Sequence, residues 1–378
     1  MANEKKDNLD GRRLMKNPDY YSVESDEAVF QMVKEFLEET VFGQPEACAE
    51  VAGPITRYLG ELCDPNRPMY IGIFMGEPGV GKTEMGMAAA KIFDPLHPEQ
   101  RLKVIDSSIF QESHDIHKII GAPPSYVGYG DEPLITNDFL SRPNVLVFDE
   151  IEKAHPALHK LLLRVMDKAR LDINGDDDSF DFMDMDKNMD GEEDLFFDPN
   201  ILDFSQSIII LTSNIGSDKI RDIKSGKGTL GFISDRINNH QKDIQIAGVA
   251  AAENYWKHMP EFLNRVDSLV VFNSLTVEVV HKLFDKFLNQ YYENQGEGGT
   301  LIMATDQLKE WVISQTDMNK AGRELKRKIN KLIITPASEI KFKIPKGVPL
   351  IADISHDEPK RVIFWLSKSM VNSASKKR

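Results

Sequence analysis

Short apolar runs alternate with longer amphipathic stretches along much of the chain. The stretches between the runs show apolar residues three and four positions apart, as in a helix, most clearly at residues 154–169. An alternation of strands and helices is typical of an α/β fold in which helices cover both faces of a parallel sheet. The runs that predict its strands are residues 71–75, 102–106, 144–148, 207–212 and 268–272.

The pattern changes after residue 272, where helices are predicted first and a closing pair of strands follows. We therefore expect a large α/β domain at residues 41–273, after a short extension at 1–40 with one amphipathic stretch. A small, mainly helical domain at 274–368 and a basic tail at 369–378 complete the prediction. The small domain's predicted elements are helices 277–292, 306–314 and 321–334 (the last one basic) and strands 350–354 and 361–366.

Composition and charge narrow the class of protein. A chain of 378 residues is long enough for two or three domains. The net charge of −14 argues against bulk nucleic-acid binding, because such binding requires neutralisation of phosphates. The sequence shows neither an apolar run of about 18 residues nor an apolar core at residues 1–16, so we expect no membrane span and no secretory signal. The two cysteines, Cys48 and Cys63, suit a reducing compartment, and we expect a cytoplasmic protein.

A phosphate-binding loop is the most specific motif. It fits G-x-x-x-x-G-K-[ST] and lies between an apolar run and a helical stretch that opens with Glu84. Its glycines allow backbone N–H groups to converge on the β- and γ-phosphates. Lys82 adds a positive charge, and the Thr83 hydroxyl is suited to ligate Mg²⁺. The residues predicted to bind the nucleotide here are Gly76, Glu77, Pro78, Gly79, Val80, Gly81, Lys82, Thr83 and Glu84.

Two further polar groups follow predicted strands. Asp149 and Glu150 come directly after an apolar run, where α/β sheets place ligands. Asp149 is suited to the Mg²⁺ shell and Glu150 to orienting and deprotonating the attacking water; the alternative is a helix N-cap. Asn214 ends the run Thr212-Ser213-Asn214 and can position the same water, although Ser-Asn also caps turns.

These motifs, in this order, resemble those of the AAA+ ATPases of the Clp/Hsp100 type, in the form of the second ATPase module of the two-ring members. The resemblance covers residues 41–366 and implies a five-stranded parallel sheet between helices, followed by a small helical domain. Besides the phosphate loop it rests on Val41-Phe42-Gly43-Gln44, Asp64-Pro65-Asn66-Arg67-Pro68, residues 120–129, residues 148–156, residues 212–216, Pro260-Glu261-Phe262-Leu263-Asn264-Arg265 and Ala321-Gly322-Arg323.

The resemblance implies roles for several residues. Val41 and Phe42 would form part of the adenine pocket. Arg265 resembles the arginine finger that reaches the γ-phosphate bound by a neighbouring subunit, which implies a ring, in this family a hexamer. The alternative for Arg265 is an ordinary salt bridge. Arg323 resembles the sensor residue that contacts the phosphates of its own subunit.

The resemblance also implies a pore. Tyr126 and its apolar neighbour Val127 lie in a Gly/Pro-rich loop which, in the family, lines the central pore and grips unfolded polypeptide. The alternative is an aromatic ring packed against its own loop. Ser125 stands where the family usually has glycine, so the flexibility of this loop departs from the pattern.

Two segments leave alternatives open. Residues 174–200 are acidic, with interspersed Phe and Met, and look longer than the family norm. They contain the first half of a calcium loop, but Phe197 at the twelfth position excludes a complete EF-hand, which leaves a solvated loop, a weak cation site or a docking loop. Leu230-Gly231-Phe232 matches the tripeptide with which protease-linked members dock a protease, or it anchors a buried loop.

The function implied is that of an ATP- and Mg²⁺-dependent protein unfoldase, a homo-hexamer that threads a protein substrate, with a compartmental protease or an adaptor as candidate partner. The alternative from another class is a slow, nucleotide-switched scaffold ATPase that organises or disassembles one dedicated complex without threading. The full set of hydrolysis residues favours turnover. The acidic charge balance disfavours a DNA-remodelling ATPase.

Overall fold

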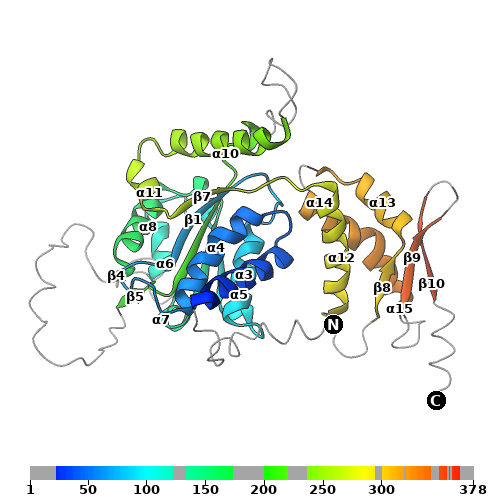
Figure 1. The fold of residues 1–378 in the computed structure, drawn as a ribbon, viewed down its shortest axis with the longest axis horizontal. Helices are drawn as coiled ribbons and strands as arrows, with labels where there is room; N and C mark the ends of the chain where they lie inside the picture. The colour runs from blue at the N-terminus through cyan, green and yellow to red at the C-terminus, as the bar shows by residue number, and fades with distance from the viewer. Residues whose placement is uncertain are drawn as a thin grey trace, which may run out of the picture. The chain divides into compact units, whose positions relative to one another are not determined.

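The chain divides into two compact units. Unit 1 comprises residues 1–76 and 82–272, and unit 2 comprises residues 77–81 and 273–378. The computed structural model describes residues 23–121, 133–172, 200–219, 236–293, 300–318, 321–341, 349–355, 357 and 360–366 (Figure 1).

Unit 1 is built on a five-stranded parallel sheet, which confirms the predicted α/β class. Its order, β2-β3-β6-β1-β7, places the three strands that carry the predicted motifs side by side. Every residue of β1 and of β6 is buried, as expected for strands covered on both faces. The strands are β1 Tyr70–Met75, β2 Leu102–Asp106, β3 Asn144–Asp149, β6 Ser207–Ser213 and β7 Ser268–Val271.

Helices cover both faces of this sheet, α3, α4 and α5 on one and α8 with α11 on the other (Figure 1). The alternation along β3 shows the division, since Leu146 and Phe148 join the core cluster that contains the α8 leucines. Val147 faces α5, where a Cβ on Gly86 would lie 2.5 Å from Val147 Cγ2, so α5 requires glycine at this close approach. The helices are α3 Val23–Thr40, α4 Pro45–Leu59, α5 Lys82–Phe93, α6 His117–Ile120, α7 Asn137–Leu140, α8 Pro156–Lys168, α10 Arg236–Tyr255 and α11 Pro260–Arg265.

A short hairpin brackets the acidic segment. β4 (Arg170–Asp172) pairs antiparallel with β5 (Ile201–Asp203), so the described chain on the two sides of residues 173–199 runs side by side. An ion pair between Arg170 and Asp203 joins the two strands. Asp172 and Ile201, close to the two ends of the described chain on either side of this segment, are therefore paired in neighbouring strands.

Unit 2 packs helices against a three-stranded sheet of order β10-β9-β8. The predicted strand pair is present, with β9 and β10 antiparallel, but the third strand β8 was not predicted. The predicted basic helix continues beyond residue 334 through a π-helical turn, Asn330–Ile334, which precedes Pro336, a residue without an N–H group. The elements are α12 Val277–Glu293, β8 Ile302–Ala304, α13 Asp306–Ser314, α14 Ala321–Ile329, α15 Thr335–Lys341, β9 Leu350–Ile354 and β10 Val362–Leu366.

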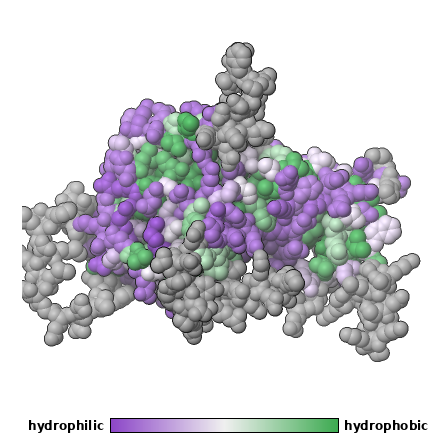
Figure 2. All heavy atoms as spheres, in the orientation of Figure 1, coloured by the Kyte–Doolittle hydropathy of each residue, from purple (hydrophilic) through white to green (hydrophobic). Residues whose placement is uncertain are grey.

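Several predictions fall outside the described residues: Tyr126 and Val127, residues 174–199, Leu230 to Phe232, residues 1–22 and the tail at 369–378. Among the described helices, none offers a stretch both long and apolar enough for a bilayer crossing. Figure 2 shows apolar patches on the surface of both units, set among polar residues.

Candidate functional site

The ends of three neighbouring strands bring the sequence motifs of unit 1 together. β6 lies between β1 and β3, and its register pairs Ser213 with Met75 and Leu211 with Phe148. The residues that follow these strands, Gly76, Asn214 and Glu150, therefore emerge at one edge of the sheet. Open α/β sheets bind their ligands at this carboxyl edge.

The phosphate loop has the backbone that its glycines predict. Gly76, Gly79 and Gly81 have φ angles of 138°, 86° and 111°, a region that residues with a side chain rarely adopt. Helix α5 begins directly after the loop, at Lys82. Residues 77–81 of the loop belong to unit 2, and within this unit Gly322 lies close to Gly79. A Cβ on Gly322 would lie 2.3 Å from the Gly79 carbonyl oxygen, which accounts for glycine in the Ala321-Gly322-Arg323 motif.

Lys82 connects the loop to the neighbouring strand. Its side chain is buried, and Nζ donates to the Gly76 carbonyl and, at 2.8 Å, to Asn214 Oδ1. A buried ammonium group requires such polar partners. The site therefore holds a fixed positive charge beside the phosphate loop.

Asn214 carries the connection further, to the catalytic candidate. Its Nδ2 donates to Glu150 Oε1 at 2.9 Å, and its backbone N–H donates to Glu152 Oε1 at 3.0 Å. Because the amide oxygen accepts from Lys82 and the amide nitrogen donates to Glu150, both ends of the side chain are used. The structure thus joins Lys82, Asn214 and Glu150 in one hydrogen-bonded row.

The carboxylates of the two acidic residues are bound by different partners, Asp149 by Thr212 and Glu150 by Asn214 and Lys153. The Thr212 hydroxyl donates to Asp149 Oδ1 and accepts from the Glu150 backbone N–H at 3.1 Å. Glu150 has left-handed backbone angles, φ 56° and ψ 51°, and its carboxylate also pairs with Lys153. Although Glu150 is the N-cap of the 3-10 turn Ile151–Lys153, its side chain makes no capping hydrogen bond, which does not favour the capping alternative.

Arg265 lies at the end of α11, away from that row along the chain. Its guanidinium pairs with Asp167, near the end of α8, and Nη1 donates to the Glu261 carbonyl at 3.3 Å. The hydrogen bond with Asp167 raises the pKa of Arg265 above its ordinary value. Within this chain Arg265 therefore makes an ion pair.

The remaining predicted residues are placed as follows. Val41 is buried at the start of the Val41-Phe42-Gly43-Gln44 run, and its carbonyl faces the Cys48 thiol at 3.9 Å. Thr83 and Glu84 lie in the first turn of α5. Arg323 lies on α14 in unit 2 and is exposed.

Sequence reasoning missed the roles of the supporting residues. Thr212, Glu152, Lys153 and Asp167 each bind a predicted site residue. Three of them lie within or beside the motif runs. Their partners become visible only through the strand order and the turn after β3.

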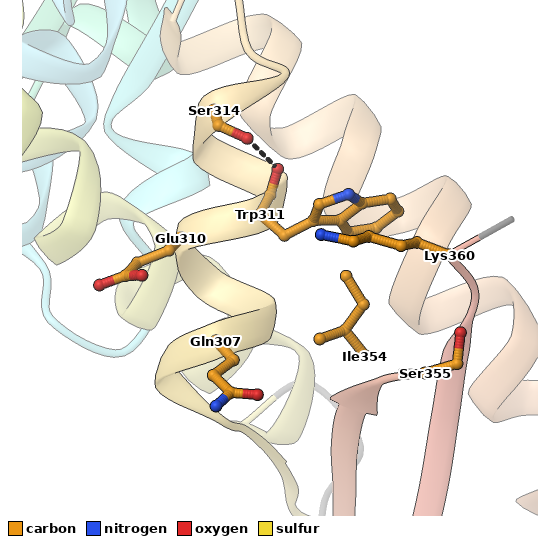
Figure 3. A pocket seen from close by; sticks show the side chains of 7 residues that line it. All are labelled: Gln307, Glu310, Trp311, Ser314, Ile354, Ser355 and Lys360. Carbon is orange, nitrogen blue, oxygen red and sulfur yellow. Dashed lines mark hydrogen bonds between the residues drawn. The ribbon is translucent and has the colours of Figure 1, made fainter. Parts of the chain in front are cut away.

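A separate hollow lies in unit 2. It has a volume of about 550 Å³. In Figure 3 the Lys360 side chain extends alongside the Trp311 indole, and Ser314 Oγ donates to the Trp311 carbonyl at 2.8 Å. None of the predicted site residues lines it, so the hollow does not support a nucleotide site. Its lining consists of Gln307, Glu310, Trp311, Ser314, Ile354, Ser355 and Lys360.

Comparisons with known proteins agree with this geometry. The family model described as AAA domain (Cdc48 subfamily) matches residues 67–269, just over half of the chain. Relatives include the "ATP-dependent Clp protease ATP-binding subunit ClpA homolog" of Porphyra purpurea, 31% identical over 89% of this chain and 38% of the relative. Another is the "Chaperone protein ClpB" of Clostridium perfringens, 34% identical over 86% of this chain and 33% of the relative.

A third relative is "Heat shock protein 100" of Trypanosoma brucei brucei, 31% identical over 82% of this chain and 33% of the relative. The matches cover most of this chain but between a third and two fifths of the length of these relatives. The matched residues include the phosphate loop, the Asp149–Glu150 pair, Asn214 and Arg265. The chain belongs to the AAA+ ATPases, in their Clp/Hsp100 group.

Proposed function

We propose that the protein is an ATP-dependent unfoldase or remodeller, which hydrolyses ATP in a hexameric ring and threads polypeptide through its central pore. The observation that carries the proposal is the row Lys82–Asn214–Glu150 beside the Thr212–Asp149 contact. It places a buried cation, a polar amide and two separately held carboxylates at the end of three adjacent strands. Phosphate binding, water activation and metal binding require these groups.

The residues present fit ATP with Mg²⁺. Three glycines with left-handed or related φ angles shape the loop after β1, and Lys82 supplies a fixed charge for phosphate. Thr83 and Asp149 would hold the magnesium ion, since hydroxyl and carboxylate oxygens are the ligands that Mg²⁺ prefers. When bound, the metal neutralises charge on the phosphates. Glu150 orients the water and accepts its proton.

Arg265 is proposed to act on the neighbouring subunit. The side chains of Arg265 and Asp167 are 37% and 45% exposed to solvent. An ion pair so exposed to solvent contributes roughly 0.2–1 kcal/mol, so a triphosphate on a neighbour can compete for the guanidinium. A finger supplied in trans requires a closed ring, which we propose to be a homo-hexamer.

The mechanical part of the proposal rests on the resemblance. Tyr126 and Val127 would grip polypeptide in the pore, and Leu230, Gly231 and Phe232 would dock a compartmental protease. The relatives' names include both a subunit of a protease and a chaperone. Delivery to a protease and protease-independent disassembly, with or without an adaptor, therefore both belong to the proposal. Two free thiols, Cys48 and Cys63, suit a reducing cytoplasm.

The test is ATP hydrolysis with and without an unfolded protein such as casein, in the wild type, Tyr126→Ala and Glu150→Gln. We expect casein to stimulate the wild type, Tyr126→Ala to lose the stimulation but keep basal turnover, and Glu150→Gln to bind nucleotide without turning it over. Strong basal turnover with no response to casein would contradict general unfolding and favour one dedicated partner. An assembled ring without turnover would favour the scaffold alternative.

A further inference from the structure

We propose that Thr212 is a positioning residue for ATP hydrolysis: its hydroxyl holds Asp149 for the metal and fixes Glu150 for the water. The proposal rests on the proposed ATPase function and goes beyond it by assigning the division of labour between two adjacent carboxylates to a third side chain. Thr212 lies on β6, the strand between those that carry the phosphate loop and the acidic pair.

The chemistry of its two partners fixes which hydrogen bond the Thr212 hydroxyl donates and which it accepts. An ionised carboxylate only accepts and a backbone N–H only donates, so Thr212 Oγ1 donates to Asp149 and accepts from Glu150. Thr212 is 1% exposed, so water does not substitute readily for either contact. A single hydroxyl thus binds both residues of the acidic pair, through the side chain of one and the backbone of the other.

The backbone of Glu150 makes this contact consequential. A residue with a side chain is strained at φ 56° and ψ 51°, and this conformation persists only where its surroundings hold it. The Thr212 oxygen accepts a hydrogen bond from the Glu150 N–H, and the Glu150 carbonyl accepts one from the Lys153 N–H at 2.9 Å. With its backbone fixed in this turn, the Glu150 carboxylate reaches Asn214 while Asp149 stays on Thr212.

A purely structural Thr212 would serve only to fill the space between strands. Val has nearly the same shape and suits a buried strand, so Thr212→Val removes both hydrogen bonds with little change in packing. Thr212→Ser keeps the hydroxyl and removes a methyl group. The two variants therefore separate hydrogen bonding from packing.

The experiment measures ATP turnover as a function of Mg²⁺ concentration in the full chain, together with the binding of a fluorescent ADP analogue with and without Mg²⁺. For Thr212→Val we expect a loss of roughly 10- to 100-fold in turnover or in apparent Mg²⁺ affinity, the usual effect of removing a partner of a metal ligand. Analogue binding without Mg²⁺ should stay near the wild-type value, and Thr212→Ser should recover most of the loss.

Ser207→Ala is the matched control. Ser207 is a fully buried residue at the opposite end of β6, and its hydroxyl has no hydrogen-bond partner in the described part of the chain. This variant should keep the wild-type Mg²⁺ dependence. If Thr212→Val does not fold, Thr212→Ala takes its place.

Three results would overturn the proposal: Thr212→Val with wild-type turnover and Mg²⁺ response, Thr212→Ser as impaired as Thr212→Val, or an equal loss of analogue binding without Mg²⁺. A wild-type protein that does not hydrolyse ATP would contradict the proposed function instead. Analogue binding would then still test whether Thr212 supports the Mg²⁺-dependent part of nucleotide affinity.

Discussion

Asn214 is the residue through which the phosphate loop and the catalytic candidate are joined. Asn214→Asp keeps the oxygen that accepts from Lys82 but replaces the donor to Glu150 with a second negative oxygen. Like charges at hydrogen-bond distance repel, so Glu150 must move from its position. Loss of a partly buried contact with a charged group costs about 1–3 kcal/mol, which corresponds to a fall of roughly 5- to 150-fold in turnover.

Asn214→Ala is the control for this prediction, because it removes both contacts without adding charge. Turnover and binding of the fluorescent ADP analogue, measured side by side, separate catalysis from affinity. We expect Asn214→Asp to hydrolyse ATP more slowly than Asn214→Ala. Turnover at the wild-type rate in Asn214→Asp would show that the amide contact with Glu150 has no part in hydrolysis.

At the scale of elements, the contact between α8 and α11 positions the Arg265 side chain, which pairs with Asp167 of α8. Asp167→Asn removes the ion pair between these helices, which is exposed, so the free energy of unfolding should fall by less than about 1 kcal/mol. ATP turnover should not fall, because Arg265 must leave Asp167 to reach a neighbour's phosphate. Urea unfolding and steady-state hydrolysis test the two statements.

Asp203→Asn is a suitable comparison, since the exposed pair between Arg170 and Asp203 joins β4 and β5 at 3.4 Å, away from α11. Both variants lose one surface ion pair, and we expect similar small changes in stability. If Asp167→Asn reduced turnover as strongly as Arg265→Ala does, Asp167 would instead be needed to orient the finger.

The contact between the same two helices includes a buried histidine of α8, His159, whose protonation opposes folding. His159 on α8 packs edge-on against Phe262 of α11, with ring centroids 5.1 Å apart, and near Trp256 at 6.4 Å. Burial lowers the pKa of His159, and its hydrogen bond with the His155 backbone opposes this only in part. The unfolded chain, with an ordinary histidine pKa of about 6.5, therefore binds the proton more readily than the folded one.

The contribution of neutral His159 to the free energy of unfolding is thus fully present above about pH 6.5. It falls as the pH drops from there towards the lower pKa of His159 in the folded protein. His159→Phe keeps an aromatic ring and cannot take up the proton. We expect the free energy of unfolding, measured in urea at about pH 7.5 and about pH 5.5, to fall more in the wild type than in this variant. Equal losses in the two proteins would contradict the prediction.

The sequence predicted these elements unevenly, for physical reasons. Buried strands such as β1 and β6 are continuous apolar runs and were found within one or two residues of their ends. β8 has three residues, of which Met303 is exposed. So short a run is not long enough to show the alternation of apolar and polar residues that predicts a strand. Helix α10 was not predicted by its own range; its buried residues near the C-terminal end, Ala251 and Ala252, are small, and its apolar pattern is weak.

The candidate site was also predicted in part, its motif residues from the sequence and the contacts between them only from the structure. Glycine, lysine and carboxylate at fixed spacing predicted the residues that the structure brings together at the sheet edge, because each motif is local in the sequence. The contacts of Thr212 with Asp149, and of Arg265 with Asp167, join residues 63 and 98 positions apart. They depend on the order of the strands and on the packing of α8 against α11, which no local pattern encodes.

At the scale of the whole molecule, the proposed ring makes each active site the product of two subunits. Glu150 would serve the nucleotide of its own chain, and Arg265 that of the next chain. Glu150→Gln and Arg265→Ala should each be inactive alone, the latter because a finger is worth on the order of 10³–10⁵ in rate. Mixed in one ring, however, a subunit with Arg265→Ala retains Glu150 and can receive Arg265 from a Glu150→Gln neighbour.

Mixing the two inactive variants should therefore restore hydrolysis. For random assembly in equal amounts, about a quarter of the sites combine an intact Glu150 with an intact Arg265, so turnover should approach about a quarter of the wild-type value. A mixture of Glu150→Gln with the double variant Glu150→Gln/Arg265→Ala contains no such site and should stay inactive. If the first mixture also stays inactive while light scattering and subunit exchange show mixed rings, Arg265 does not act across the interface. The ion pair with Asp167 would then be its role in the protein.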